Sequence, residues 1–170
     1  MEVGWHGGCK LKGCICRWGN RQSRPEERCG LNLRLRREGA KVLLVDDDER
    51  IRDSLRLFFE DQGCSFMAVG SSEHALEELA RQSFDVIILD YKLPGMNGLE
   101  LLGRIRETHP AAAKIFTTAY TSKGLFAQAK EAGAVDFIQK PLTAEKIEDC
   151  LARIDHWSGI AGHRERDETA

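Results

Sequence analysis

The chain has 170 residues, of which 42% are hydrophobic and 31% charged, and its formal net charge is −2. This composition is typical of a globular protein with one domain and a buried core, and no run approaches the roughly 18 apolar residues of a membrane-spanning helix. Residues 1–39 carry nine Lys or Arg and four Asp or Glu, whereas the remainder carries 16 and 23. The overall balance favours neither a nucleic acid nor a membrane as partner.

Residues 1–39 are rich in Gly, Arg and Cys and lack sustained periodicity, which predicts a disordered basic extension. The extension has no apolar segment like that of a secretory signal, so a cytoplasmic location with reduced thiols is expected. Its cysteines lack the paired spacing of a structural zinc site; they stand at positions 9, 14, 16 and 29. Cys64 and Cys150 lie in patterned segments and are interpreted as small core residues. Residues 158–170 predict a mobile tail.

From Ala40 onward, short apolar runs alternate with amphipathic segments. Continuous apolar runs are typical of strands that are buried on both faces of a parallel sheet. They predict strands at 41–45, 65–69, 86–89, 114–117 and 136–138. The amphipathic segments predict helices at about 50–62, 73–82, 99–107, 122–132 and 144–157. Either Ser71 or Ser72 can cap the second helix, whose expected inner face is Ala75, Leu76, Leu79 and Ala80.

Five strands that alternate with five helices over residues 40–157 predict a doubly wound α/β domain. Right-handed crossovers leave few topologies for such a domain. We expect the flavodoxin-like (βα)5 arrangement, a five-stranded parallel sheet in the order 2-1-3-4-5. In this order the first and third strands are neighbours at the point where ligands bind.

Charged residues follow three of the predicted strands, as Asp46-Asp47-Asp48, Asp90 and Lys140. Because the carboxyl ends of parallel strands share one edge of the sheet, these groups should meet there. Clustered carboxylates repel one another unless a hard cation neutralises them, and Mg²⁺ prefers a few carboxylates together with water. The sequence therefore predicts a magnesium site beside a lysine. Asp48 is expected to favour the start of the first helix instead.

Residues 40–157 resemble the receiver domain of the two-component response regulators. The resemblance rests on residues that agree in type, order and strand context, namely Asp46-Asp47, Asp90, Thr118, Lys140 and Leu93-Pro94-Gly95-Met96-Asn97-Gly98. It implies that Asp90 is phosphorylated in a reaction that needs Mg²⁺, and that the domain catalyses its own phosphorylation and slow dephosphorylation.

The resemblance also implies a role for each group at the edge. Asp47, Asp90 and the main-chain carbonyl of Lys92 would bind Mg²⁺ directly, and Asp46 would bind it through water. Lys140 would contact a phosphoryl oxygen. These residues together would form the catalytic and metal-binding centre of the domain.

A switch and an output surface are implied as well. Thr118 would carry the switch hydroxyl, and Phe137 would be the aromatic residue that turns inward as Thr118 moves. The output surface would include Tyr120, Lys123 and Phe126. The phosphoryl donor would be a sensor histidine kinase or a phosphotransfer protein, and the resemblance allows a homodimer linked to phosphorylation.

Other classes of protein fit less well. A haloacid dehalogenase-type hydrolase needs a second Asp two residues after the first, where this chain has Lys92. A dinucleotide-binding fold needs Gly-x-Gly-x-x-Gly after the first strand, where this chain has an acidic run. Direct DNA binding is not expected, because the domain is acidic and residues 158–170 have no room for a helix-turn-helix. A receiver-like module that binds partners without phosphorylation remains the alternative.

Overall fold

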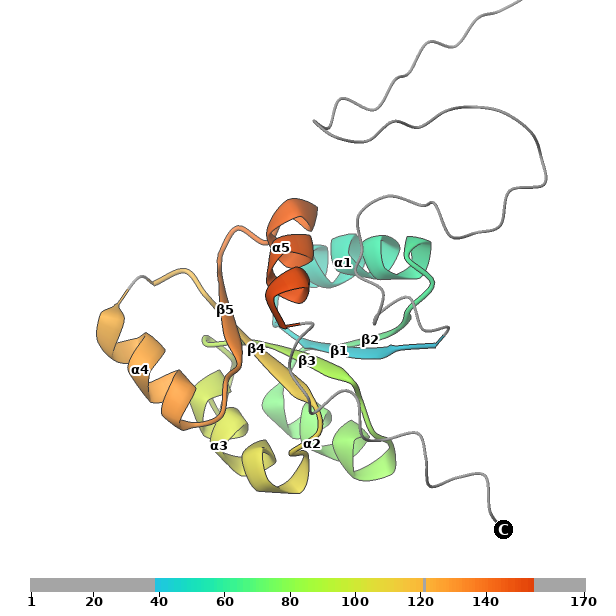
Figure 1. The fold of residues 1–170 in the computed structure, drawn as a ribbon. Coiled ribbons are helices and arrows are strands. Elements are labelled where there is room, and N and C mark those ends of the chain that lie inside the picture. The colour runs from blue at the N-terminus through green and yellow to red at the C-terminus, as the bar shows by residue number, and fades with distance from the viewer. Residues whose placement is uncertain (1–38, 121, 155–170) are drawn as a thin grey trace, which may run out of the picture. The chain divides into compact units, whose positions relative to one another are not determined.

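The structure is a computed structural model that describes residues 39–120 and 122–154. The expected extension, the tail and the last turn of the fifth helix therefore lie outside the described residues. Strands and helices alternate strictly through the described part (Figure 1). The strands are β1 (Lys41–Val45), β2 (Ser65–Val69), β3 (Val86–Asp90), β4 (Ala113–Thr118) and β5 (Asp136–Gln139). The helices are α1 (Glu49–Asp61), α2 (Ser72–Arg81), α3 (Gly98–Thr108), α4 (Lys123–Glu131) and α5 (Ala144–Ile154).

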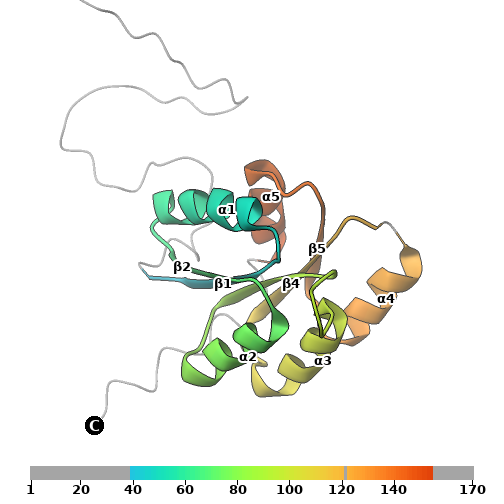
Figure 2. The ribbon, with the colours of Figure 1, turned by 180° about the vertical axis from the view of Figure 1, so that it is seen from behind.

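The strands form one parallel sheet in the order β2-β1-β3-β4-β5, which confirms the predicted fold. Helices α1 and α5 cover one face of the sheet, and α2, α3 and α4 cover the other (Figures 1 and 2). The register pairs Val45 with Leu89, Asp90 with Thr117, and Thr118 with Gln139. These pairs bring the carboxyl ends of β1, β3, β4 and β5 to one edge.

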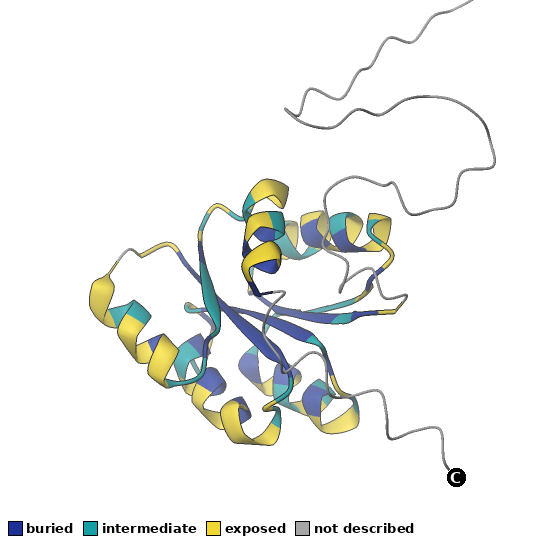
Figure 3. Ribbon diagram, viewed as in Figure 1, coloured by how far each residue is buried: buried dark blue, intermediate teal, exposed yellow. Residues whose placement is uncertain are grey.

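The core consists of two apolar layers, one on each side of the sheet. Val42 and Leu44 pack into the layer beneath α1 and α5, whereas Leu43 and Val45 pack into the other, and none of the four has any exposed surface. Figure 3 shows the central strands buried throughout and the helices exposed on their outer sides. Because both faces are covered, each central strand needs apolar residues at consecutive positions, which is the pattern seen in the sequence.

Local chemistry sets the helix ends. The side chains of Asp48, Ser71 and Asn97 cap the N-termini of α1, α2 and α3 by accepting hydrogen bonds from backbone N–H groups of the first turn. Gly63 and Gly133 follow α1 and α4 with φ angles of 75° and 107°, which residues other than glycine rarely adopt. The expected position of Asp48 at the start of α1 is thus confirmed.

The expected inner face of α2 is wrong at its C-terminal end. Ala80 is exposed, while Ser72, Ala75 and Leu79 are buried and Leu76 is half-buried. The helix advances 3.6 residues per turn, so a stripe through 72, 75, 76 and 79 faces the sheet and position 80 turns away from it. The buried side of α2 therefore begins at Ser72 and ends at Leu79.

Candidate functional site

Three carboxylates meet at the carboxyl ends of β1 and β3. Asp46, Asp47 and Asp90 each offer one oxygen atom, and these atoms all lie within 4.8 Å of one another. Asp46 has no exposed surface and Asp90 is 4% exposed, whereas Asp47 is open to solvent. The sequence predicted this cluster from residues that are up to 44 positions apart.

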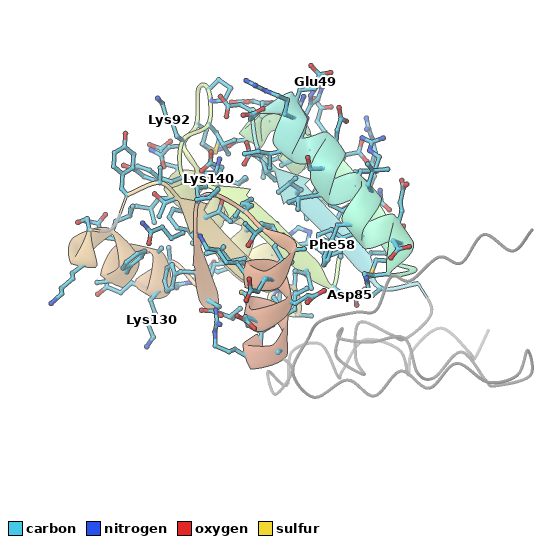
Figure 4. All side chains as sticks on the ribbon, turned by 90° about the horizontal axis from the view of Figure 1, so that it is seen from above. Glu49, Phe58, Asp85, Lys92, Lys130 and Lys140 are labelled. Atoms are coloured by element: carbon cyan, nitrogen blue, oxygen red, sulfur yellow. The ribbon has the colours of Figure 1, made fainter. Side chains whose placement is uncertain are left out.

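Lys140 lies among these acids. Its Nζ atom donates to Oδ2 of Asp46 at 2.8 Å and to Oδ2 of Asp90 at 2.7 Å. Figure 4 shows Lys140 and Lys92 at the same end of the molecule as Glu49, the first residue of α1, while Asp85 lies toward the opposite end. One ammonium group therefore neutralises part of the charge of two buried carboxylates.

The surroundings shift the protonation of both partners in the same direction. Burial raises the pKa of Asp90, an effect strengthened by the charge of Asp46 and opposed by hydrogen bonds from Lys140 and the Lys92 backbone. Burial alone would lower the pKa of Lys140, but its hydrogen bonds to Asp46 and Asp90, and their charges, raise it. Burial therefore favours the protonated form of Asp90, while the two carboxylates favour the protonated form of Lys140.

A cavity of about 480 Å³ opens beside this cluster. It is lined by Asp47, Asp48, Asp90, Tyr91, Lys92, Thr118, Ala119, Tyr120 and Lys140. Thr118 is 1% exposed, and its hydroxyl oxygen accepts a hydrogen bond of 3.0 Å from the backbone N–H of Tyr120. The neighbouring Thr117 is not among the lining residues and donates to the main-chain carbonyl of Leu89. Of these two threonines, Thr118 is therefore the one that lines the cavity.

The predicted switch residue Phe137 contacts the predicted output residue Phe126. The half-buried ring of Phe137 lies 6.4 Å from that of Phe116 and 5.1 Å from that of Phe126 in α4, measured between centroids. Tyr120 is 55% exposed, and Lys123 is exposed at the start of α4. Phe126 is only half-exposed, because it packs against Phe137. Phe137 thus links the β4–β5 region of the core to α4.

The loop between β3 and α3 closes tightly on itself next to the site. The backbone N–H of Gly98 donates to the carbonyl of Tyr91 at 3.0 Å. A Cβ atom at position 98 would overlap the main-chain oxygen of Asp90, so only glycine fits there. This closure fixes the direction in which the chain leaves Asp90 and passes through Lys92.

Some residues that support the site were not found from the sequence. Arg52 donates from Nη1 to the main-chain oxygen of Asp46 at 2.8 Å. Ser72 donates to the main-chain oxygen of Met96 at 2.7 Å. Lys146 donates to the main-chain oxygens on both sides of the site lysine, at 2.8 and 3.1 Å. A signal was present only for Arg52, which is a basic residue on the first turn of a helix that begins beside the acids. The contacts of Ser72 and Lys146 are set by tertiary structure.

The donor set fits a magnesium ion. It consists of carboxylate oxygens, and it contains no Cys or His among the residues that the structure describes. Lys140 supplies one positive charge for three acids. The open side next to Asp47 leaves room for the water ligands that Mg²⁺ retains.

The fold and site together define a class, a doubly wound α/β domain with an acidic cavity at the carboxyl edge of its central strands. Residues 42–152 match the response regulator receiver domain, and the chain belongs to this family. The resemblance to receiver domains that the sequence suggested is thereby confirmed.

The chain is similar to response regulator protein FleR of Pseudomonas aeruginosa, with 41% identity over 114 residues that cover 67% of this chain and 24% of FleR. It is also 31% identical over 113 residues to sporulation initiation phosphotransferase F of Bacillus subtilis, covering 66% of this chain and 91% of that protein. The chain therefore spans about a quarter of the length of FleR but nearly all of the shorter relative.

Solved structures agree with these relatives. Chemotaxis protein CheY4 of Vibrio cholerae superposes with a TM-score of 0.65 at 30% identity, covering 68% of this chain and 98% of that one. A response regulator of Burkholderia pseudomallei, solved with a phosphorylated aspartic acid, a calcium ion and citrate, gives 0.62 at 27% identity and 65% coverage of both chains. Within residues 39–120 and 122–154, no helix has the length and hydrophobicity of a membrane span.

Proposed function

We propose that Asp90 accepts a phosphoryl group from a sensor histidine kinase or a phosphotransfer protein, and that the phosphorylated domain signals through an altered protein-binding surface. The observation that carries the proposal is the convergence on Asp90 of Lys140, at 2.7 Å, and of two further carboxylates within 4.8 Å. The cavity beside Asp90 gives a donor access to a carboxylate that is otherwise buried.

The chemistry balances as a displacement at phosphorus. A carboxylate oxygen of Asp90 forms the new bond to phosphorus as the bond between phosphorus and the donor imidazole nitrogen breaks, and the imidazole keeps the electron pair. Mg²⁺, held by Asp47, Asp90 and the main-chain carbonyl of Lys92 and through water by Asp46, would screen the negative charges of both reactants. The Nζ atom of Lys140 donates a hydrogen bond to Oδ2 of Asp90, and after phosphorylation it would donate to a phosphoryl oxygen instead.

Signalling would follow from the new anion. The Thr118 hydroxyl proton can be donated to a phosphoryl oxygen, and the movement of Thr118 would leave space for Phe137 to turn inward. Charge-assisted hydrogen bonds contribute about 1.5–3 kcal/mol each, and about 5.5 kcal/mol inverts a two-state population from 1:99 to 99:1. Two such bonds, from Thr118 and Lys140, are of that order. The changed surface would include Tyr120, Lys123 and Phe126 and could support a homodimer of phosphorylated chains.

The test is the intact mass of the protein after incubation with acetyl phosphate. We expect an adduct of about 80 Da that requires Mg²⁺, is absent with EDTA and is absent in Asp90→Asn. Asp53→Asn, which alters an exposed carboxylate of α1, serves as the matched control and should be labelled like the wild type. Absence of an adduct on a folded wild-type protein would reject the proposal and favour a module that binds partners without phosphorylation.

A further inference from the structure

The loop from Tyr91 to Asn97 carries Lys92, whose main-chain carbonyl is a proposed ligand of the metal ion. Its ends are fixed by the hydrogen bond from Gly98 to Tyr91 and by Asn97, which caps α3. Within its middle, Leu93 is buried in the core layer beside α2 and α3, and Met96 packs partly against that layer. What holds this middle part also sets where the Lys92 carbonyl can lie.

The first turn of α2 adds a polar contact to this apolar packing. Ser72 has no exposed surface, and its hydroxyl donates to the main-chain oxygen of Met96 at 2.7 Å. A hydrogen bond from its own backbone N–H is the main cause that lowers the pKa of the neighbouring Glu73. The buried Ser72 hydroxyl thus ties the main chain of the loop to the start of α2.

The loop also lies directly against Glu73. Gly95 has a φ angle of 72°, and a Cβ atom built on it would be 3.1 Å from Oε1 of Glu73. The close approach and the hydrogen bond from Ser72 to Met96 are independent signs that the loop and α2 fit together. We call Ser72 and Glu73 the α2 latch.

The Ser72 hydroxyl is not needed to begin the helix. Ser71 caps α2, because its hydroxyl oxygen accepts a hydrogen bond of 3.3 Å from the backbone N–H of His74. The buried Ser72 hydroxyl does not cap the helix and instead donates a hydrogen bond to a loop 24 residues away, so its role is in tertiary structure. This separates the function of two adjacent serines.

We propose that Ser72, supported by Glu73, is a positioning residue for the metal site, because it holds the loop in the form that presents the Lys92 carbonyl. The inference rests on the proposed function, in which that carbonyl binds Mg²⁺. An ion that binds to a loop already held in place does not have to order it, so the latch raises affinity without touching the ion.

The test is isothermal titration calorimetry of Mg²⁺ binding to the full chain. We expect Ser72→Ala to raise the dissociation constant about three- to tenfold, less than is typical for groups that bond directly to a metal-binding side chain. At saturating Mg²⁺ the extent of labelling by acetyl phosphate should match the wild type. Amide hydrogen exchange in the metal-free protein should be faster at residues 92–97 in the variant.

Two further variants distinguish loss of the latch from a general weakening of helix α2. Ser71→Ala deletes the neighbouring hydroxyl and weakens the start of α2, and we expect it to leave the Mg²⁺ dissociation constant within twofold of the wild type, since about 0.4 kcal/mol corresponds to that factor. Glu73→Ala removes an exposed side chain, so it keeps the experiment decisive should Ser72→Ala fail to fold. It should weaken Mg²⁺ binding in the same direction as Ser72→Ala.

The outcomes distinguish the inference from the function on which it rests. A wild-type protein that neither binds Mg²⁺ nor becomes labelled overturns the proposed function, and the inference with it. A wild-type protein that does both, alongside Ser72→Ala and Glu73→Ala variants with unchanged Mg²⁺ affinity and unchanged loop exchange, overturns the latch alone. Equal weakening in Ser71→Ala would also overturn it, because helix stability would then explain the effect.

Discussion

Asp90 is subject to two opposing influences. Burial and the charge of Asp46 favour its protonated form, while the hydrogen bond from Lys140 favours its ionised form, and the net result is a raised pKa. A carboxyl group whose pKa is raised by folding stabilises the folded state below its unfolded pKa, and this contribution is lost as pH rises through the folded pKa. At neutral pH the ionised Asp90 is therefore a local cost to stability.

This sign leads to a stability prediction for Asp90→Asn in the absence of metal. At pH 7 in EDTA the variant should melt at a higher temperature than the wild type, because the amide removes a charge that is buried and repelled by Asp46. The difference should shrink as the pH is lowered toward the ordinary value of 3.8, where the wild-type carboxyl also becomes neutral. Thermal melts across this pH range provide the measurement, and a less stable variant at pH 7 would contradict it.

The sequence was sufficient for the residues that define the site, but not for those that hold them. Asp46, Asp47, Asp90 and Lys140 were recognisable because each stands at the end of an apolar run, and parallel strands must end at the same edge. Ser72 gave no such signal, since its partner Met96 is fixed only by the path of the folded loop.

Among the elements, the loop between β3 and α3 has the strictest steric requirement. A Cβ atom at Gly98 would overlap the Asp90 carbonyl oxygen, which belongs to the backbone and cannot move aside cheaply. Gly103 lies in the middle of α3, is exposed, and a Cβ atom there would meet no other atom within 4 Å. A side chain is therefore sterically excluded at Gly98 but has free space at Gly103.

We predict opposite effects of alanine at these two positions. Gly98→Ala should destabilise the protein by about 2–3 kcal/mol, because the backbone at Asp90 must shift. Gly103→Ala should stabilise it by about 0.5–1 kcal/mol, because alanine loses less conformational entropy in a helix. Chemical denaturation of both variants gives the free energies of unfolding, and equal effects of the two substitutions would refute the steric explanation.

Strand positions were predicted better than strand ends. The runs at 41–45 and 65–69 coincide with β1 and β2, whereas β3, β4 and β5 each extend one residue further at the carboxyl end, to Asp90, Thr118 and Gln139. Polar residues marked the end of each apolar run, yet the ladder of backbone hydrogen bonds continues through them. Site residues inside strands are held more rigidly than loop residues would be.

At the scale of the whole molecule, the described core is made by residues between Ala40 and Ile154. We propose residues 40–157 as the bounds of the domain, with the match to receiver domains covering 42–152. The expectation that residues 1–39 form a separate extension lies almost wholly outside the described residues.

Removal of residues 1–39 should leave the domain nearly as stable as the full chain. We expect the free energy of unfolding to fall by less than about 0.5 kcal/mol, because residues 1–39 lack the apolar periodicity of an element that packs into a core. Denaturant melts of the full and shortened chains provide the comparison. A much larger loss would mean that the extension packs against the domain.

The parallel order of the strands has a consequence for a chain that is still being synthesised. Lys140 follows Asp46 by 94 residues and Asp90 by 50, and the residues of α5 that complete one core layer follow Lys140. On the ribosome, both acids therefore emerge long before the ammonium group that pairs with them. A nascent chain gains the lysine that offsets part of its acidic charge, and the helix that completes one core layer, in the same final stretch, so the proposed phosphorylation site is complete only as folding ends.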